Sequence, residues 1–263
     1  MTEFAFLSGL PRTGSTVLGT LLSQHPDLHP TPTSCVRDLL RQVKGFNLGE
    51  SPYFDVKDPD SPVWGMMRGM LYGAYEHVPE KIVVEKDRGW AQDVELIRRL
   101  TGSQPKILSP VRPIPEIIAS FVLISKKIGA NSKIEDELRA SGKPSRPWSL
   151  SRVIWEKYIY ASWRAFKAGY EQDPDCFLLL EYDDIVNKPG DTFSRICDYL
   201  GIETWAPTTT GLVNPNPEND SIYGMPGLHT VKTKLERTSP PAWEVLGDEC
   251  YSFWADRNLE FWK

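Results

Sequence analysis

The sequence of 263 residues predicts an α/β protein with a central parallel sheet and helices on both of its faces. Two observations support this prediction. Short apolar runs, typical of buried strands, alternate along the chain with longer segments whose apolar residues recur at helical spacing. The first run ends in a glycine-rich turn that leads directly into a helical pattern. Strands that alternate with helices in this way form parallel sheets, because each crossover helix returns the chain to the same edge.

Four short apolar runs are predicted as strands, at residues 4–8, 81–86, 105–111 and 176–182. Runs that are apolar almost throughout are typical of strands covered on both faces of the sheet. The first predicted helix begins at Ser15, directly after the glycine turn, and ends where a His-Pro-Asp turn at residues 25–27 interrupts its pattern. The predicted helices span residues 15–24, 35–43, 63–77, 91–100, 114–125, 150–169 and 192–200.

Two long segments show no periodic pattern. They are residues 126–147, which are polar, and residues 206–240, which are rich in Pro, Asn, Gly and Thr. Irregular segments of this length in compact domains are usually lids or binding loops. We therefore expect both to cover a ligand site at the carboxyl ends of the strands, where open α/β sheets bind ligands. The length of the chain predicts a single domain over residues 1–263.

The composition narrows the class of protein. A chain that is 40% hydrophobic and 25% charged is typical of soluble globular proteins, and its net charge of −5 argues against nucleic-acid binding. The four cysteines form no C-x-x-C pair, which predicts reduced thiols and neither a zinc site nor a redox motif. No signal peptide and no membrane-spanning apolar run is recognisable, so we expect a cytoplasmic protein without a membrane span.

The glycine turn lies in the stretch SGLPRTGSTVLGTLL and has the spacing of a phosphate-binding loop with one difference. Gly9 and Gly14 occupy the glycine positions of G-x-x-x-x-G-K-[ST], and Thr16 occupies the hydroxyl position. Ser15 stands where such loops carry lysine, and the cation of this loop is Arg12. Backbone N–H groups of a glycine loop and of the helix that follows it bind anions, so an anion site is predicted here.

A second anion site is predicted at the end of the strand over residues 105–111. Arg112 follows this strand at a place where a nucleoside triphosphatase would carry an acidic residue for Mg²⁺. Prolines suited to the first turn of a helix come next, and Ser120 lies on that helix eight residues beyond Arg112. A cation in this position argues against a metal ion and for a second anionic group.

The two motifs, LPRTGSTVL followed by VRPIPEIIAS, resemble the cofactor motifs of sulfotransferases that use 3′-phosphoadenosine 5′-phosphosulfate, PAPS. The form of the loop is more similar to the tyrosylprotein and bacterial branches than to the cytosolic phenol and steroid branch. The resemblance covers most of the chain, residues 4–201, and implies a three-layer P-loop-type fold. It also implies transfer of a sulfuryl group from PAPS, without a metal, to a hydroxyl or amine acceptor that the sequence does not identify.

The resemblance further implies which residues bind the cofactor. The 5′-phosphosulfate would be held by the loop residues Arg12, Thr13, Gly14, Ser15 and Thr16. Arg112 and Ser120 would hold the 3′-phosphate, and Tyr182, in the stretch LLLEYDDIV, would lie near the adenine. The stretch MPGLHTVKTKLER, which includes Lys232, resembles a basic loop that closes over the cofactor in this family.

Sulfuryl transfer accounts for the loop without a lysine. A sulfuryl group carries less negative charge than a terminal phosphoryl group, and its transfer needs no Mg²⁺ bridge between phosphates. The guanidinium of Arg12 presents a fork of donors that would hold the 5′-phosphate and the bridging oxygen, where leaving-group charge develops.

A general base must take the proton of the acceptor. We place it in the stretch VVEKDRGW, at the end of the strand over residues 81–86, with Asp87 ahead of Glu85. Alternate residues of a strand face opposite sides, so these two carboxylates share a side, while Lys86 points away and would assist the leaving group. Neighbouring cations would keep Asp87 ionised, as a base must be. His29, after the first predicted helix, is the third candidate.

Two other functions fit the same loop. A metal-dependent P-loop nucleotide kinase would turn over ATP with Mg²⁺, but Ser15 and Arg112 occupy positions where it needs a lysine and an acidic metal ligand. A non-catalytic nucleotide-binding protein on the same fold would bind PAPS without turnover. The sequence does not predict the oligomeric state.

Overall fold

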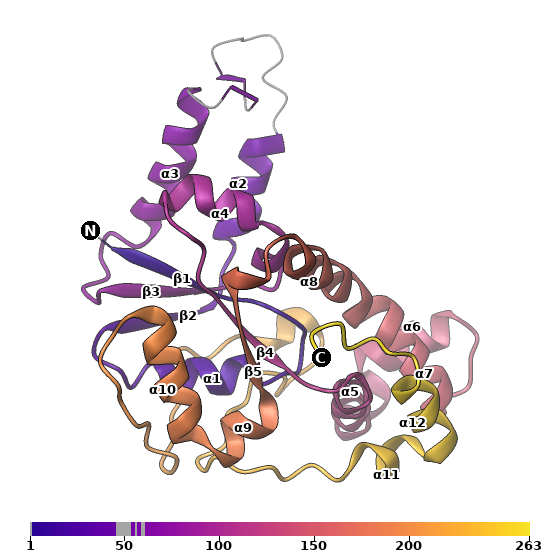
Figure 1. The fold of residues 1–263 in the computed structure, drawn as a ribbon. Coiled ribbons are helices and arrows are strands. Elements are labelled where there is room, and N and C mark those ends of the chain that lie inside the picture. The colour runs from indigo at the N-terminus through magenta and orange to yellow at the C-terminus, as the bar shows by residue number, and fades with distance from the viewer. Residues whose placement is uncertain (1, 46–53, 56, 59–60) are drawn as a thin grey trace.

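Five parallel strands form the central sheet of the computed structural model, which describes residues 2–45, 54–55, 57–58 and 61–263 (Figure 1). The strand order is β2-β3-β1-β4-β5, so the first strand lies in the middle of the sheet. This arrangement confirms the predicted α/β class and the parallel sheet. The strands are β1 (Glu3–Leu7), β2 (Leu28–Thr33), β3 (Ile82–Lys86), β4 (Ile107–Val111) and β5 (Phe177–Glu181).

The strand β2 is absent from the sequence prediction because its sequence, LHPTPT, contains two prolines. Proline has no N–H to donate to a neighbouring strand and is therefore tolerated mainly at the edge of a sheet. β2 is an edge strand that pairs only with β3, with a register shift between Pro30 and Thr33. The prolines are compatible with this edge position, but the segment is not a continuous apolar run, so the sequence does not predict the strand.

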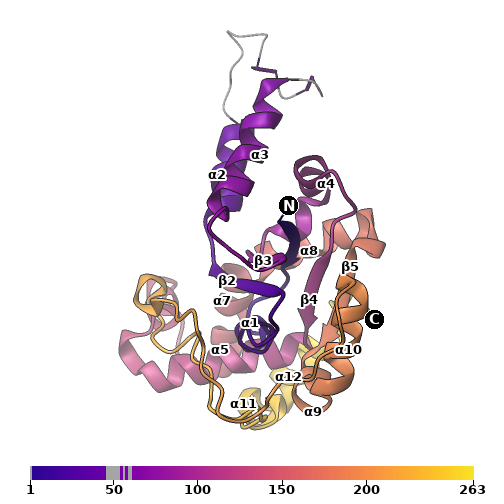
Figure 2. The same ribbon diagram turned by 90° about the vertical axis from the view of Figure 1, so that its left-hand side faces the viewer.

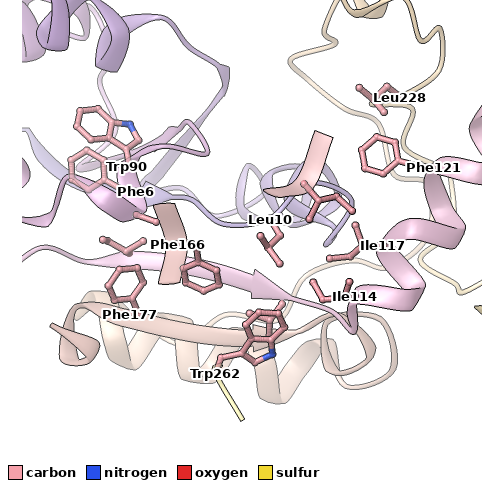
Figure 3. Packing of buried hydrophobic residues seen from close by; sticks show 14 of the residues in the cluster. Phe6, Leu10, Trp90, Ile114, Ile117, Phe121, Phe166, Phe177, Leu228 and Trp262 are labelled. Atoms are coloured by element: carbon pink, nitrogen blue, oxygen red, sulfur yellow. The ribbon is translucent and has the colours of Figure 1, made fainter. Parts of the chain in front are cut away.

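Helices cover both faces of the sheet, and two hydrophobic clusters separate the three layers. On β1, Phe4 and Phe6 belong to the larger cluster, while Ala5 and Leu7 belong to the smaller one. Figure 3 shows the larger cluster, in which Phe6 packs against Trp90 with ring centroids 4.7 Å apart. The smaller cluster lies under α1 (Ser15–Leu22), α9 (Tyr182–Asn187) and α10 (Pro189–Leu200).

The opposite face and the end of the sheet beside β4 carry the remaining helices. The helices α2 and α3 project from the sheet as a pair at the top of both views (Figures 1 and 2). Within the described residues, no helix combines the length and the apolar character that crossing a bilayer requires. The remaining helices, on the opposite face and beside β4, are α2 (Val36–Gly45), α3 (Pro62–Ala74), α4 (Val94–Thr101), α5 (Ile114–Ile128), α6 (Lys133–Ala140), α7 (Pro147–Ile154), α8 (Tyr160–Gln172), α11 (Ala242–Leu246) and α12 (Asp248–Ala255).

The prediction that residues 126–147 are irregular is wrong for much of this segment, because α5 continues to Ile128 and α6 follows it. The hydroxyl of Ser132 caps α6 by accepting from the N–H of Ile134 at 3.3 Å. Ile134 and Leu138, one helical turn apart, bury the apolar side of α6. Because the neighbouring residues are charged, these two apolar residues alone do not form a recognisable helical pattern in the sequence.

Residues 206–240, here called the strap, contain one short 3₁₀ turn at Asp220–Tyr223 and are otherwise largely irregular, as predicted. The strap doubles back on itself, because Thr210 bridges Lys234 and the N–H of Leu212 donates to the carbonyl of Thr233. In Figure 2 this doubled segment, drawn in light orange, runs beside β2 before the chain reaches α11.

Gly169 of α8 packs directly against the backbone of a neighbouring helix. A Cβ atom there would lie 1.6 Å from the carbonyl oxygen of Ala91, which belongs to the short helix Trp90–Gln92. Because the obstacle is backbone, Gly169→Ala should lower the free energy of unfolding by about 1–3 kcal/mol or more, measured by urea denaturation. The matched control is Gly65→Ala in α3, where an added Cβ would meet no atom from another part of the described structure within 4 Å and alanine should stabilise by about 0.5–1 kcal/mol. Equal effects of the two substitutions would contradict this packing.

Candidate active site

The loop between β1 and α1 has the geometry of an anion cradle. Gly9 has φ +149° and Gly14 has φ +95°, conformations that side chains rarely adopt. The hydroxyl of Thr13 closes the loop by donating to the carbonyl of Leu10 at 2.8 Å. Gly14 is the N-cap of α1, and its carbonyl accepts from the N–H of Leu18 at 2.8 Å. The first N–H groups of a helix have no intrahelical partner, so those of α1 are available to a ligand.

Tyr182 connects the loop to the second motif. The residue begins α9, directly after β5, and a Cβ at Gly14 would lie 2.8 Å from its ring. On the ring lies the guanidinium of Arg112, 4.4 Å from the ring centroid. The structure therefore brings together three motifs that are far apart in the sequence, and Gly14 is required both by its φ angle and by the ring beside it.

Arg12 lies inside the loop in a left-handed conformation, with φ +61°. Its Nε donates to the hydroxyl of Ser120 at 3.1 Å, and its Nη1 donates to the carbonyl of Leu228 in the strap. Burial, together with the nearby charges of Arg112 and Arg88, lowers the pKa of Arg12 to about 10. Guanidinium groups that repel one another favour the binding of an anion between them.

Arg112 is buried, with 6% of its surface exposed, and its position is fixed on two sides. Its Nε forms an ion pair with Glu116 at 2.9 Å, and its Nη1 donates to the carbonyl of Arg12 at 3.4 Å. Glu116 also pairs with Arg237 of the strap at 2.9 Å. A small hollow adjoins the larger cavity over the loop. It is lined by Arg112, Glu116, Ser120 and Arg237.

A cavity of about 190 Å³ opens over the loop. The strap supplies one wall, and the loop, Arg88, Arg112 and the first residues of α9 supply the other. Seven of the nine predicted cofactor-binding residues line this cavity, while Thr13 is buried and Ser120 lies in the adjacent hollow. Basic side chains outnumber acidic ones in the described lining: Arg12, Arg88, Arg112, Lys232 and Lys234 against Glu236.

An ammonium group from β3 lies beside the loop that lacks the P-loop lysine. The ammonium of Lys86 donates to the hydroxyl of Thr16 at 3.3 Å and to Glu218 of the strap at 2.6 Å. In a nucleoside triphosphatase the hydroxyl at the position of Thr16 binds Mg²⁺. Here an ammonium group contacts that hydroxyl. Burial lowers the pKa of Lys86, while its pairing with Glu218 opposes this shift.

The comparison of the chain with protein-family models matches the model described as "Sulfotransferase family" over residues 5–207. The chain belongs to the sulfotransferase family. No curated protein matches it in sequence.

Among solved structures, the sulfotransferase is similar to the sulfotransferase domain from the curacin biosynthetic pathway. The identity is 21%, the match covers 77% of this chain and 75% of that one, and the TM-score is 0.49. A sulfotransferase from Alicyclobacillus acidocaldarius has 18% identity, coverage of 82% and 87%, and a TM-score of 0.46. The sulfotransferase domain of the Synechococcus PCC 7002 olefin synthase has 17% identity. The match covers 99% of this chain and 89% of that one, with a TM-score of 0.45.

Glu85 and Lys86 face opposite sides of the sheet, as strand alternation predicts. The carboxylate of Glu85 is fully buried on the α3 face, where it accepts hydrogen bonds from Ser34, Tyr75 and Trp90. Burial raises the pKa of Glu85 to about 7, against the effect of these donors. The three donors fix Glu85 on the face of the sheet opposite to Lys86 and α1.

The other two predicted bases occupy different places. Asp87 accepts from the N–H of Gly89 at 2.7 Å, lies 3.5 Å from the guanidinium of Arg37, and lines a small hollow next to the loop. Burial raises its pKa, while Gly89 and Arg37 oppose the shift. His29 lies near the amino end of β2, 3.5 Å from Glu80, so the structure does not bring it to the loop at the opposite end of the sheet.

Glu218 and Asp220 of the strap are site residues that the sequence reasoning missed. Glu218 pairs with Lys86, and Asp220 accepts a 2.6 Å hydrogen bond from His229. Both acids lie in an aperiodic segment rich in Pro and Asn, so no spacing connects them to the loop. The only signal in the sequence was the basic stretch around His229, predicted to close over the cofactor.

The buried hydrogen bonds of Glu85 predict a structural role in this sulfotransferase. Glu85→Ala leaves three buried donors without an acceptor, and each unpaired donor costs about 1–3 kcal/mol. We expect a loss of a few kcal/mol in the free energy of unfolding, measured by urea denaturation. The control, Glu95→Ala on the exposed side of α4, should change it by less than about 0.5 kcal/mol. Wild-type stability of Glu85→Ala together with lost turnover would instead support Glu85 as the base.

Proposed function

We propose that this sulfotransferase transfers a sulfuryl group from PAPS to a hydroxyl or amine acceptor. The observation that supports the proposal best is the placement of two neighbouring arginines, Arg12 and Arg112, beside the ring of Tyr182. Arg12 lies inside the loop, and Arg112 stacks on Tyr182 while donating to the carbonyl of Arg12. Two guanidinium groups held this close fit a ligand with two separate anionic groups, as PAPS has.

The loop residues fit the 5′-phosphosulfate. The N–H groups around Gly14, the hydroxyls of Ser15 and Thr16, and the guanidinium of Arg12 line the same cavity. Their donors would bind the phosphate oxygens, and the positive end of the α1 dipole would add to the attraction. Thr13 would contribute its backbone N–H, because its hydroxyl already donates to Leu10.

The second motif fits the 3′-phosphate and the adenine. Arg112 and Ser120 lie on adjoining hollows, and Glu116 holds the Arg112 fork in place. The ring of Tyr182 forms a wall of the cavity on which a base can stack. Lys232 of the strap also lines this cavity and would contact an anionic group from the opposite side.

The chemistry follows from the charges around the loop. PAPS supplies the activated sulfuryl group, and the protein must stabilise the negative charge that develops on the leaving phosphate. Arg12 lies within the loop and donates to Ser120, and Lys86 donates to the loop hydroxyl of Thr16. We propose that they stabilise this charge. Of the three bases predicted from the sequence, Asp87, Glu85 and His29, only Asp87 lines the hollow next to the loop, and its carboxylate lies 3.5 Å from the guanidinium of Arg37.

A Mg²⁺-dependent kinase is a weaker alternative. It needs a metal at the loop hydroxyl, but the ammonium of Lys86 lies 3.3 Å from the hydroxyl of Thr16. After β4 it needs an acidic residue, and this chain has Arg112 there. A non-catalytic nucleotide-binding protein would share the cavity and would differ from the proposed enzyme in the lack of turnover.

Arg112→Ala should separate the 3′-phosphate from the rest of the nucleotide. One charged hydrogen bond contributes about 1.5–3 kcal/mol, which corresponds to a loss of about 10–150-fold in affinity for 3′-phosphoadenosine 5′-phosphate. The affinity for adenosine 5′-monophosphate, which lacks the 3′-phosphate, should stay near the wild-type value. Isothermal titration calorimetry in the presence of EDTA measures both. Equal losses for the two nucleotides would contradict the assignment of Arg112.

A further inference from the structure

The strap brings a histidine to the edge of the phosphate loop and holds it there. Leu228 is buried in the larger hydrophobic cluster beside Phe121 (Figure 3), and its carbonyl accepts a hydrogen bond from Arg12. The residue that follows, His229, is therefore fixed next to the loop arginine by both packing and hydrogen bonding. Its side chain is 8% exposed. A segment without regular secondary structure is thus anchored at the position that faces the loop.

Asp220 fixes the orientation of the His229 ring. One carboxylate oxygen lies 2.6 Å from Nδ1 of the ring, and the other accepts from the backbone N–H of His229 at 2.9 Å. A carboxylate on Nδ1 selects the tautomer that carries its proton there, so that Nε2 has a free lone pair. In the described part of the chain, no hydrogen bond involves Nε2. This pairing of carboxylate and imidazole is the arrangement that orients a histidine as a general base.

The ring of His229 lies between the donor cavity and the hollow at the strand ends. It lines the cavity over the loop together with Arg12 and Thr16, and it lines the adjoining hollow together with Ser15 and Lys86. The carboxyl ends of β1 and β3 meet at this hollow. A group that enters it would lie between His229 and the loop hydroxyls, on the side from which an acceptor can approach.

Glu218 supplies an independent sign of a ligand. Its Oε1 accepts from Lys86 at 2.6 Å and from the N–H of Thr33 at 3.3 Å. Its Oε2 has no hydrogen-bond partner among the described residues, although the side chain is only 7% exposed, and it lies 3.6 Å from Nδ1 of His229. A buried carboxylate oxygen without a donor is costly unless a ligand supplies one. A hydroxyl or amine is a donor of this kind.

We propose that His229 is the general base of this sulfotransferase, that Asp220 positions its ring, and that Glu218 binds the acceptor. The inference rests on the proposed function. The acceptor oxygen or nitrogen attacks the sulfur of PAPS and forms the new bond to it, and its proton passes to Nε2 of His229. The bond from sulfur to the bridging oxygen breaks, and its electron pair stays on the 5′-phosphate of 3′-phosphoadenosine 5′-phosphate.

The environment of His229 keeps its imidazole suited to this task. Burial lowers its pKa, and the nearby ammonium of Lys86 acts in the same direction, while Asp220 and Glu218 oppose the shift. An imidazole that stays neutral at neutral pH has its Nε2 lone pair available. The ring of Tyr223 packs edge-on at 5.6 Å and limits the movement of the imidazole.

The activity test measures the release of 3′-phosphoadenosine 5′-phosphate from PAPS, with water alone and with a panel of phenols and primary alcohols. His229→Gln should lower the rate by about 10²–10⁴-fold, the usual contribution of a positioned base. Affinity for 3′-phosphoadenosine 5′-phosphate should stay within about threefold. The matched control is His25→Gln, which replaces another buried, hydrogen-bonded histidine and should leave the rate near the wild-type value. In the cavity variant His229→Ala, added imidazole should restore part of the rate, which a purely structural role does not predict.

A second readout does not depend on turnover. Nitrogen-15 NMR of the histidine rings should show His229 protonated on Nδ1 in the wild type, and Asp220→Asn should remove this tautomer preference. Equal rates for wild type and His229→Gln, or no rescue of His229→Ala by imidazole, would overturn this inference and leave the proposed function standing. If the wild type does not bind 3′-phosphoadenosine 5′-phosphate, the proposed function and this inference fail together.

Discussion

The contact between the buried ammonium of Lys86 and the hydroxyl of Thr16 is the interaction on which the site depends. A buried charge is costly unless it has partners, and Lys86 meets this requirement with Thr16 at 3.3 Å and Glu218 at 2.6 Å. The second contact joins the strap to β3. The loop, which lacks the lysine of a P-loop, therefore has an ammonium group from the neighbouring strand beside it, and the same ammonium pairs with the strap.

This arrangement links the fold to the chemistry. Because β1 lies in the middle of the sheet, its loop is flanked by the ends of β3 and β4, which supply Lys86 and Arg112. Strand alternation then places two adjacent residues on opposite faces of the sheet, where they have different partners. Lys86 faces α1 and the loop, whereas Glu85 faces the larger cluster and binds three donors there. The proposed donor site is built from these strand ends, the helices that follow them, Tyr182 after β5, and the strap.

Much of this could be predicted from the sequence, and the failures have physical causes. The buried strands are apolar runs, and the loop motif follows one of them, so both are visible without a structure. The prolines of β2 and the charged residues around Ile134 and Leu138 conceal elements that tertiary packing stabilises. Glu218 acts through a partner more than 100 residues away, Lys86, and Asp220 acts on His229 from a short turn within the strap. No local sequence pattern encodes either role.

The most direct test of the account is the turnover of PAPS by Lys86→Met, with Lys81→Met at the exposed start of the same segment as the control. Loss of one preorganised donor to a developing negative charge typically costs about 10²–10³-fold in rate. We expect a loss of this size for Lys86→Met, none for Lys81→Met, and partial recovery when Ser15→Lys returns an ammonium to the loop. Wild-type turnover by Lys86→Met would contradict the claim that β3 supplies the charge missing from the loop.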